Sequence, residues 1–255
     1  MLEIKNLHFE YSKKTPVLQG LDLKLQPGEV GTLLGKNGSG KTTLFKNLIG
    51  VCKPKKGIAE LEGKNLFALS GRERAKLVAY VPQSIEFGDL SVFDSVLSGR
   101  IAYFSLAADK KDIAVAERVI KEMGLSSIAH RNVNELSGGE RQKVAIARAM
   151  AQEPLLMVFD EPTGNLDIAN EQLIIREAKR LAKEKNIAVL SSVHDLNEAL
   201  SFGDKFFFLK DGVIKYAGGK EIVTEEVILD VFDAEIHIET INNRKVILGG
   251  DFYEH

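Results

Sequence analysis

The sequence predicts an α/β fold that combines a parallel sheet, a small antiparallel sheet near the N-terminus and an inserted helical region. Residues 155–159 and 187–190 are short, continuous apolar runs, which are typical of parallel strands covered by helices on both faces. Residues 2–5 and 21–26 instead alternate apolar and polar side chains, as half-buried antiparallel strands do. Strands that alternate with helices after residue 150 indicate the parallel core.

Three helices are indicated by their spacing and by their end signals. Apolar residues at helical spacing predict a helix over 113–123, which Gly124 ends. Ser137 and Glu140 have the spacing of a capping box, so a second helix begins there. A third helix is expected over 168–185, because acidic residues lie early and basic residues late in it, which matches the helix dipole.

The domain organisation follows from these elements. We expect one domain, in which residues 84–153 form a mostly helical insertion and 221–255 a short C-terminal extension. Residues 1–83 and 154–220 supply the two sheets. Two hairpins are predicted near the C-terminus, over 206–214 around an Asp-Gly turn and over 236–248.

Composition and charge exclude several classes of protein. The 255 residues include 34 Lys and Arg against 36 Asp and Glu, a formal charge of −2, which disfavours a sequence-independent nucleic-acid binder. The one cysteine, Cys52, excludes a disulfide framework and a multi-cysteine metal site, and it fits a reducing compartment. No apolar run approaches the roughly 18 to 20 residues of a membrane span, and the N-terminus lacks the features of a secretion signal. We therefore expect a cytosolic chain.

A glycine-rich loop carries the first chemical signal. Residues 35–42 match the pattern Gly-x-x-x-x-Gly-Lys-[Ser/Thr], follow the strand-like run 30–34 and open an apolar helix. The glycines let backbone N–H groups surround phosphate groups, while Lys41 reaches the β- and γ-phosphates and the Thr42 hydroxyl can bind Mg²⁺. The alternative is a fortuitous glycine turn, which the strand before the loop and the helix after it argue against.

Two adjacent acids end a predicted buried strand. Asp160 and Glu161 follow the run 155–159, so they lie at the carboxyl edge of the sheet, where α/β folds bind ligands. Asp160 would hold Mg²⁺ through water, and Glu161 could polarise the water that attacks the γ-phosphate. Without the phosphate loop upstream, such a pair would be read as a solvated strand end.

The predicted helix start at Ser137 is a second candidate anion site. Ser137-Gly138-Gly139 places nothing bulky near the first N–H groups of the helix. A bare Ser-Gly-Gly is more often a capped loop, and only a family resemblance favours the binding role.

Five motifs in sequence order make the chain resemble the nucleotide-binding subunit of an ABC transporter over nearly its whole length. Residues 136–140 resemble the signature motif, 35–42 the Walker A loop and 155–161 the Walker B strand with its catalytic glutamate. Gln83 lies where the family has its Q-loop, and His194 matches its switch histidine. The resemblance implies a P-loop NTPase core of the ABC ATPase type, which hydrolyses ATP with Mg²⁺.

The resemblance also assigns the individual site residues. Leu166 and Asp167 resemble the D-loop, and Tyr11 resembles the aromatic residue that stacks on adenine. The implied ATP-binding residues are Tyr11, Gly35, Asn37, Gly38, Ser39, Gly40, Lys41, Thr42 and Thr43. The implied catalytic residues are Glu161, His194 and Gln83, and the implied Mg²⁺ ligands are Thr42, Gln83 and Asp160. Taken alone, Tyr11 would be read as a loop aromatic and His194 as a structural histidine.

Family geometry implies a head-to-tail homodimer that holds ATP between one subunit's P-loop and its partner's signature. Ser137, Gly138, Gly139 and Glu140 would therefore act in trans. ATP would close the dimer and hydrolysis would reopen it.

The chain has no predicted membrane span, so a transporter requires separate permease subunits, and the chain would lie at the cytoplasmic face of the inner membrane. Residues 90–100 resemble the permease-facing stretch of importers for iron–siderophore, haem, cobalamin and related metal chelates. A substrate-binding protein would then be an indirect partner, and nucleic acid would not be one.

Several alternatives stay open at this point. Zinc and manganese importers share part of the permease-facing pattern, and Gly164-Asn165 is closer to lipoprotein-release and macrolide-export ATPases. A soluble ABC protein that acts on ribosomes or DNA usually has two cassettes or a coiled-coil insertion. A nonhydrolytic module should lack Lys41 or Glu161. Gly31 interrupts the strand before the P-loop and is expected to allow close packing.

Overall fold

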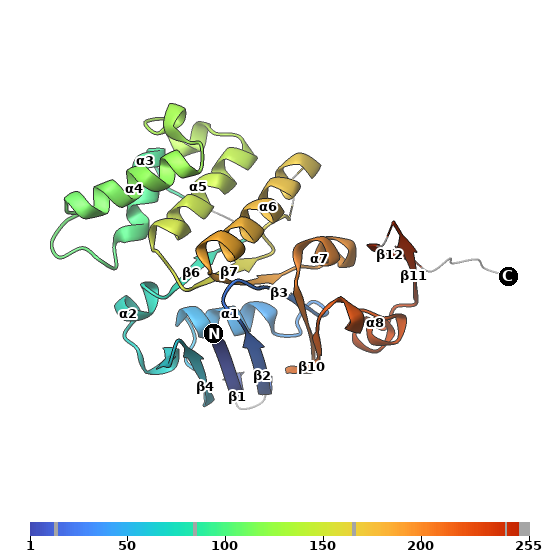
Figure 1. Cartoon of the computed structure of the whole chain (residues 1–255). Helices are drawn as coiled ribbons and strands as arrows, with labels where there is room; N and C mark the ends of the chain where they lie inside the picture. Colours follow the sequence, from blue (N-terminus) through green and yellow to red (C-terminus); the bar gives the residue numbers. More distant parts are fainter. Residues whose placement is uncertain (13–14, 84–85, 165–166, 243, 250–255) are drawn as a thin grey trace.

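A six-stranded sheet forms the centre of the molecule (Figure 1). The computed structural model describes residues 1–12, 15–83, 86–164, 167–242 and 244–249. In spatial order the strands are β10 (Val213–Gly218), β9 (Lys205–Lys210), β3 (Val30–Leu34), β8 (Ala188–Ser192), β7 (Leu156–Asp160) and β6 (Val78–Val81). All neighbours are parallel except the β9–β10 hairpin, so the predicted parallel core is confirmed.

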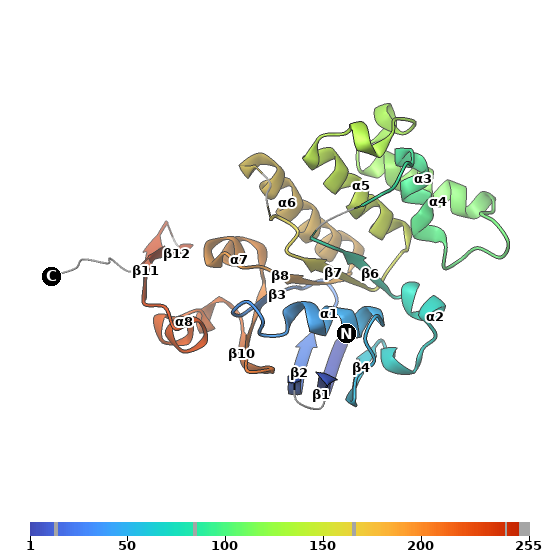
Figure 2. The same cartoon turned by 180° about the vertical axis from the view of Figure 1, so that it is seen from behind.

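The predicted antiparallel sheet is also present. It contains, in spatial order, β2 (Thr15–Leu25), β1 (Leu2–Ser12), β4 (Lys56–Leu61) and β5 (Lys64–Asn65). Figures 1 and 2 show α1 (Lys41–Ile49) between this sheet and the central one. Leu44, Phe45 and Leu48 of α1 are buried with the leucines of β1 and β2 in a single apolar cluster. This cluster fixes the helix that follows the glycine-rich loop.

Side chains of the central strands alternate between two apolar layers, which explains their continuous apolar runs. Leu156 and Val158 of β7 belong to the layer around α1. Met157 and Phe159 belong to the opposite layer, under the helices. A strand buried on both faces has no polar side, so its sequence shows no period of two.

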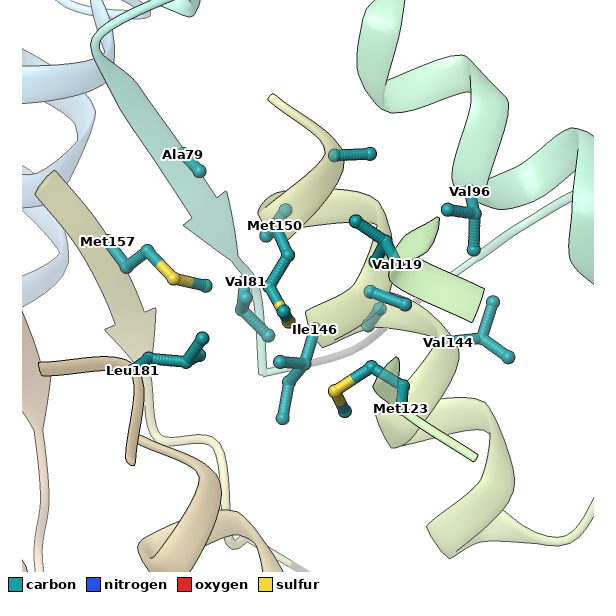
Figure 3. Packing of buried hydrophobic residues seen from close by; sticks show 14 of the residues in the cluster. Ala79, Val81, Val96, Val119, Met123, Val144, Ile146, Met150, Met157 and Leu181 are labelled. Carbon is teal, nitrogen blue, oxygen red and sulfur yellow. The ribbon is translucent and has the colours of Figure 1, made fainter. Parts of the chain in front are cut away.

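The inserted helical region covers the second layer. It contains α3 (Val92–Leu97), η2 (Ser98–Arg100), α4 (Lys110–Glu122), η3 (Ser126–Ile128), η4 (Val133–Glu135) and α5 (Gly138–Ala151). Figure 3 shows Ile146 and Met150 of α5 between Val81 of β6 and Val119 of α4. Helix α5 therefore joins the helical region to the sheet.

The remaining elements are distributed around both sheets. They are η1 (Leu66–Ala68), α2 (Gly71–Ala75), α6 (Ile168–Lys185), α7 (Leu196–Phe202), η5 (Lys220–Ile222), α8 (Glu225–Phe232) and the hairpin β11 (Ile236–Ile241) and β12 (Arg244–Gly249). Both predicted C-terminal hairpins are thus present. In the part of the chain that is described, no helix combines the length and the apolar character that crossing a bilayer requires.

Two predicted elements are present with ends that differ from those expected, each for a local reason. The helix expected from residue 113 begins at Lys110, because Asp109 and Asp112 form a capping box, and Ile113 is largely exposed instead of packing in the core. The strand expected over 187–190 extends through Ser191 and Ser192, because both serines pair with β7. The expected close packing at Gly31 is found, since a Cβ there would lie 2.9 Å from side-chain atoms of Leu25 and Phe207.

A buried ion pair holds the helical region together. Arg100 is 1% exposed, and its guanidinium donates to Asp112 Oδ1 at 3.1 Å and to the Ala151 carbonyl at 2.9 Å. The guanidinium also stacks on the ring of Tyr103, 3.6 Å from its centroid. A buried charge is tolerated only when it is paired and hydrogen-bonded, so these contacts join α4 to the end of α5.

Replacing Arg100 by methionine should lower the free energy of unfolding by about 3–5 kcal/mol, because the Asp112 carboxylate stays buried without its partner. The matched control is Arg118→Met, which removes an exposed guanidinium that pairs with Glu153 at 2.8 Å, the carboxylate that Arg100 also contacts at 2.9 Å, and it should cost about 1 kcal/mol or less. Urea unfolding followed by circular dichroism measures both. Equal losses in the two variants would contradict the role of the buried pair.

Candidate functional site

The glycine-rich loop connects β3 to α1 and has backbone geometry that favours glycine. Gly38 and Gly40 have φ angles of 81° and 112°, in the left-handed region. A Cβ on Gly35 would lie 2.4 Å from the Leu209 carbonyl oxygen, so the loop can pass β9 only with glycine there. Gly40 caps α1 without a side-chain hydrogen bond, which leaves the first N–H groups of the helix open to an anion.

Lys41 and Ser39 indicate what the loop can hold. The Lys41 ammonium is buried and donates to the carbonyls of Gly35 at 2.7 Å and Lys36 at 3.3 Å. Burial lowers its pKa, while the nearby carboxylates of Glu161 and Asp160 oppose that shift. The Ser39 hydroxyl is buried without a hydrogen-bond partner among the described residues. An unpartnered hydroxyl and a buried cation around open N–H groups fit a phosphate chain.

Asp160 is the buried carboxylate of the site. Its Oδ1 accepts from the Ser192 hydroxyl at 2.8 Å and from the Thr42 hydroxyl at 3.4 Å, and its Oδ2 accepts from Tyr80 at 3.1 Å. Burial and the neighbouring Asp160 raise the pKa of Tyr80, so the phenol stays protonated and donates. A carboxylate beside a hydroxyl at a phosphate site is a typical Mg²⁺ donor set, because Mg²⁺ is usually completed by water and substrate oxygens.

Glu161 lies next to Asp160 and is surrounded by two predicted site residues. Gln83 donates to Glu161 Oε2 at 2.7 Å, and His194 Nδ1 lies 3.8 Å from the same oxygen. Glu161 has a φ of 47°, and its N–H donates to the Ser192 hydroxyl at 3.0 Å. The three side chains follow β6, β7 and β8, which are adjacent parallel strands whose carboxyl ends meet at one edge.

The side chain of Gln83 is thus hydrogen-bonded to the Glu161 carboxylate. The family resemblance also implied that Gln83 is a ligand of Mg²⁺. The described contacts join Thr42 to Asp160 and Gln83 to Glu161. Among the described residues no cluster of three or more His, Cys, Asp and Glu side chains could hold a metal ion. A Mg²⁺ ion at Asp160 and Thr42 would thus depend on substrate phosphates and water for its other ligands.

Tyr11 and Asn37 lie on different sides of the loop. Tyr11 is 59% exposed, its hydroxyl lies 3.3 Å from Thr43 Oγ1 in the first turn of α1, and its ring packs edge-on against Phe9. Asn37, with Gly38, Ser39 and Val17, lines a cavity of 420 Å³ beside the loop. The exposed ring of Tyr11 is free to stack on a base at the start of α1.

The signature residues lie at the start of α5. Ser137 caps this helix and forms the predicted capping box with Glu140, whose pKa is lowered by hydrogen bonds from the Ser137 hydroxyl and N–H. Gly138 is exposed in the first turn. Among the described residues, no side-chain hydrogen bond or ion pair joins this turn to the glycine-rich loop of the same chain. The two candidate anion sites are separate.

Gly139 connects the signature to the start of α6. A Cβ on Gly139 would lie 1.9 Å from the Asn170 amide oxygen, so this contact needs glycine. Asn170 in turn donates to Asp167 Oδ2 at 2.8 Å, and Asp167 caps α6. The other D-loop residue, Leu166, and Asn165 lie outside the described residues. The structure thus joins Gly139 to Asp167 through Asn170.

Three contact residues were missed by sequence analysis. Ser192 holds both Asp160 and Glu161, Tyr80 holds Asp160, and Asn170 joins the signature to Asp167. A polar residue at the carboxyl end of an apolar run could have indicated Ser192. Nothing in the spacing marks Tyr80 or Asn170, because their roles arise from strand register and helix packing.

Comparison with known proteins places the chain among transport ATPases. Residues 18–164 match the ABC transporter family. The chain is 40% identical to an uncharacterized ABC transporter ATP-binding protein of Methanocaldococcus jannaschii, over 97% of each chain. It is 34% identical to the iron(3+)-hydroxamate import ATP-binding protein FhuC of Bacillus subtilis, over 94% of this chain and 91% of that protein. It is 37% identical to the spermidine/putrescine import ATP-binding protein PotA of Mesoplasma florum, over 89% and 63%.

Solved structures of ABC transporter subunits are also similar to this chain. An inward-facing metal-chelate type ABC transporter contains a chain similar to this one, with a TM-score of 0.82, 29% identity and coverage of 97% and 95%. The cbiO1 protein of Clostridium perfringens, part of the transporter complex cbiONQ, has a TM-score of 0.78 at 27% identity, with coverage of 90% and 92%. A dimeric bacterial ABC transporter cassette has a TM-score of 0.71 at 27% identity, with coverage of 86% and 98%.

Proposed function

This chain belongs to the ABC transporter family as an ATP-binding subunit and ATPase, and we propose that it drives the import of a metal chelate. It would act as a homodimer at the cytoplasmic face of the cell membrane, bound to separate permease subunits. Within the chain we propose a sheet-containing core (1–83 with 154–220), a helical subdomain (84–153) and a short extension (221–255).

The grouping of Glu161, Gln83 and His194 beside the phosphate loop carries the proposed hydrolysis site. Glu161 would orient and polarise the attacking water, since its carboxylate is held by Gln83 and lies beside Asp160. Lys41 and the N–H groups of α1 would hold the phosphates in line with that water. Thr42 and Asp160 would hold Mg²⁺, which would neutralise part of the charge on the phosphates.

The proposed dimer explains why the chain has two anion sites that do not meet. The first turn of α5, from the cap Ser137 through Gly139, has N–H groups to which an anion could bind. No described contact joins this turn to the phosphate loop of the same chain. A second copy placed head to tail would bring its signature to the first copy's phosphate chain. Resemblance to a dimeric cassette supports this arrangement.

The proposed cargo rests on the likeness to a metal-chelate type transporter over almost the whole chain. The iron(3+)-hydroxamate relative supports the same class, whereas the spermidine/putrescine relative matches over a smaller share of its own length. The permease-facing surface would be residues 90–100, where Leu90 is exposed, and the exposed Ile101 and Leu106 follow directly after it. A substrate-binding protein would deliver the chelate to the permease.

Replacing Glu161 by glutamine should lower ATP turnover by at least about 100-fold, because the amide keeps the shape of the side chain but cannot polarise water. ATP binding should be retained, since Lys41 and the loop are unchanged, and an ATP-bound dimer should accumulate. Phosphate release and size-exclusion chromatography measure these effects. Glu117→Gln, an exposed isosteric change in α4, is the control, and unchanged turnover in Glu161→Gln would refute the assignment.

Replacing Ser137 by arginine should abolish hydrolysis and ATP-dependent dimerisation while the monomer still binds ATP, because the bulky side chain blocks a site that acts only in trans. Nucleotide titration of the monomer and light scattering with ATP test this. Ser137→Ala separates the loss of the helix cap, about 1 kcal/mol, from the block. Loss of ATP binding by the Ser137→Arg monomer would show that the signature acts in cis.

Transport tests the cargo directly. We expect proteoliposomes that contain this chain and the permease subunits of its own organism to accumulate a ferric hydroxamate, haem or cobalamin when ATP is supplied, and Glu161→Gln to prevent it. Spermidine and zinc serve as competing cargoes. Uptake of only these, or ATP-dependent efflux, would contradict the proposed class.

A further inference from the structure

A basic pocket lies far along the chain from the phosphate loop, at the C-terminal hairpin. It has a volume of 590 Å³, within the range of small-molecule sites, and is formed by α6, α7, η5 and the β11–β12 hairpin. Both views show α7 between α6 and this hairpin (Figures 1 and 2). Its charged lining residues are Lys179, Lys220, Arg244, Lys245 and Glu221.

The positive charges of this pocket are poorly compensated. Among the described residues, Lys179, Lys220 and Arg244 have no ion pair and no side-chain hydrogen bond. Lys245 donates to the carbonyls of Lys220 at 3.0 Å and Val223 at 2.7 Å, and it attracts the Glu221 carboxylate without a described ion pair between them. Four cations therefore face one acid in a chain whose overall charge is −2.

The single acid, Glu221, is already engaged by the backbone. Its Oε1 accepts from the Gly219 N–H at 2.7 Å, and such hydrogen bonds lower its pKa. Burial and the repulsion of Lys220, Lys183 and Arg244 lower the pKa of Lys179, while the carboxylate of Asp204 opposes that shift. Like charges held together around a cavity favour an anionic ligand.

Contacts within the protein hold the walls of the pocket in place. Asn197 of α7 donates to the Ile247 carbonyl at 2.8 Å and accepts from the Ile247 N–H at 2.8 Å, which fastens β12 to α7. Ile247 is buried in the apolar cluster that joins α7 and α8. The arginine and lysines are thus presented by fixed elements, which reduces the entropy lost on binding.

We propose that this pocket binds a small oxyanion with at least two negative charges, either a phosphate-bearing or a polycarboxylate compound. The planar guanidinium of Arg244 can pair with two oxygens, and Lys179 and Lys220 supply further charge-assisted hydrogen bonds. The volume suits a compact ligand that is enclosed by α6, α7 and the hairpin. The site does not depend on the proposed cargo.

Calorimetry with pyrophosphate and with citrate tests the proposal. The full chain is first saturated with ADP, so that the phosphate loop is filled and any further binding is at another site. Wild-type protein should bind at least one of the two anions, and the Lys179→Gln/Arg244→Gln variant should bind it at least about tenfold more weakly, because charge-assisted contacts are lost. Binding of pyrophosphate alone indicates a phosphate-bearing ligand, and binding of citrate a polycarboxylate.

Two controls make the outcome decisive. Lys110→Gln/Lys111→Gln removes two positive charges from the exposed start of α4 and should leave the affinity unchanged. Lys220→Gln removes one exposed positive charge at the pocket and should weaken binding. Retained ADP binding shows that each variant is folded. Equal affinity in wild type and the double variant, or no binding of either anion at about 1 mM, would overturn the proposal. Binding to anionic vesicles without either small anion would likewise overturn it, in favour of a membrane-facing patch.

Discussion

The site depends on one buried carboxylate, that of Asp160. A buried charge is costly unless donors surround it, and Asp160 receives hydrogen bonds from Ser192, Tyr80 and Thr42. These donors belong to β8, β6 and α1. Pairing of Asp160 with Ser192 and of Tyr80 with Val158 sets the register that brings them together. Any slip of one strand would leave the carboxylate unsatisfied and would also displace Glu161, so register and site geometry are coupled.

The sequence predicted the architecture, and it identified the residues that the structure brings together around the phosphate loop. A glycine-rich loop with a lysine and a threonine, placed between a strand and a helix, indicates a phosphate site. Short, continuous apolar runs indicate parallel strands that are buried on both faces of the sheet. The sequence could not predict the donors on Asp160, because Tyr80 is brought there by strand register and not by spacing. It also missed the Asn170 bridge, since the fit of Gly139 against α6 depends on how two helices cross.

Helix α6 joins three parts of the molecule that are distant in sequence. Its first turn holds Asp167 and contacts Gly139 through Asn170. In its second half Arg180 pairs with Glu122 of α4 at 2.8 Å, where both side chains are partly buried, and Lys179 faces the basic pocket. A helix of 18 residues transmits a displacement along its length of about 27 Å, because it is stiff over that distance. The signature, the D-loop residue and one wall of the basic pocket therefore share one rigid helix.

The same reasoning applies to α7, which begins at Leu196, two residues after His194. Asp195 caps this helix, and Asn197 holds β12 through two hydrogen bonds. Movement of the hairpin is thus coupled to the backbone that places His194 beside Glu161. Since the basic pocket lies between α6 and α7, an anion bound there would contact the two helices whose first residues border the hydrolysis site. This placement makes the C-terminal hairpin part of the frame of the ATPase, because two hydrogen bonds fix the hairpin to α7 and Lys179 of α6 lines the pocket beside it.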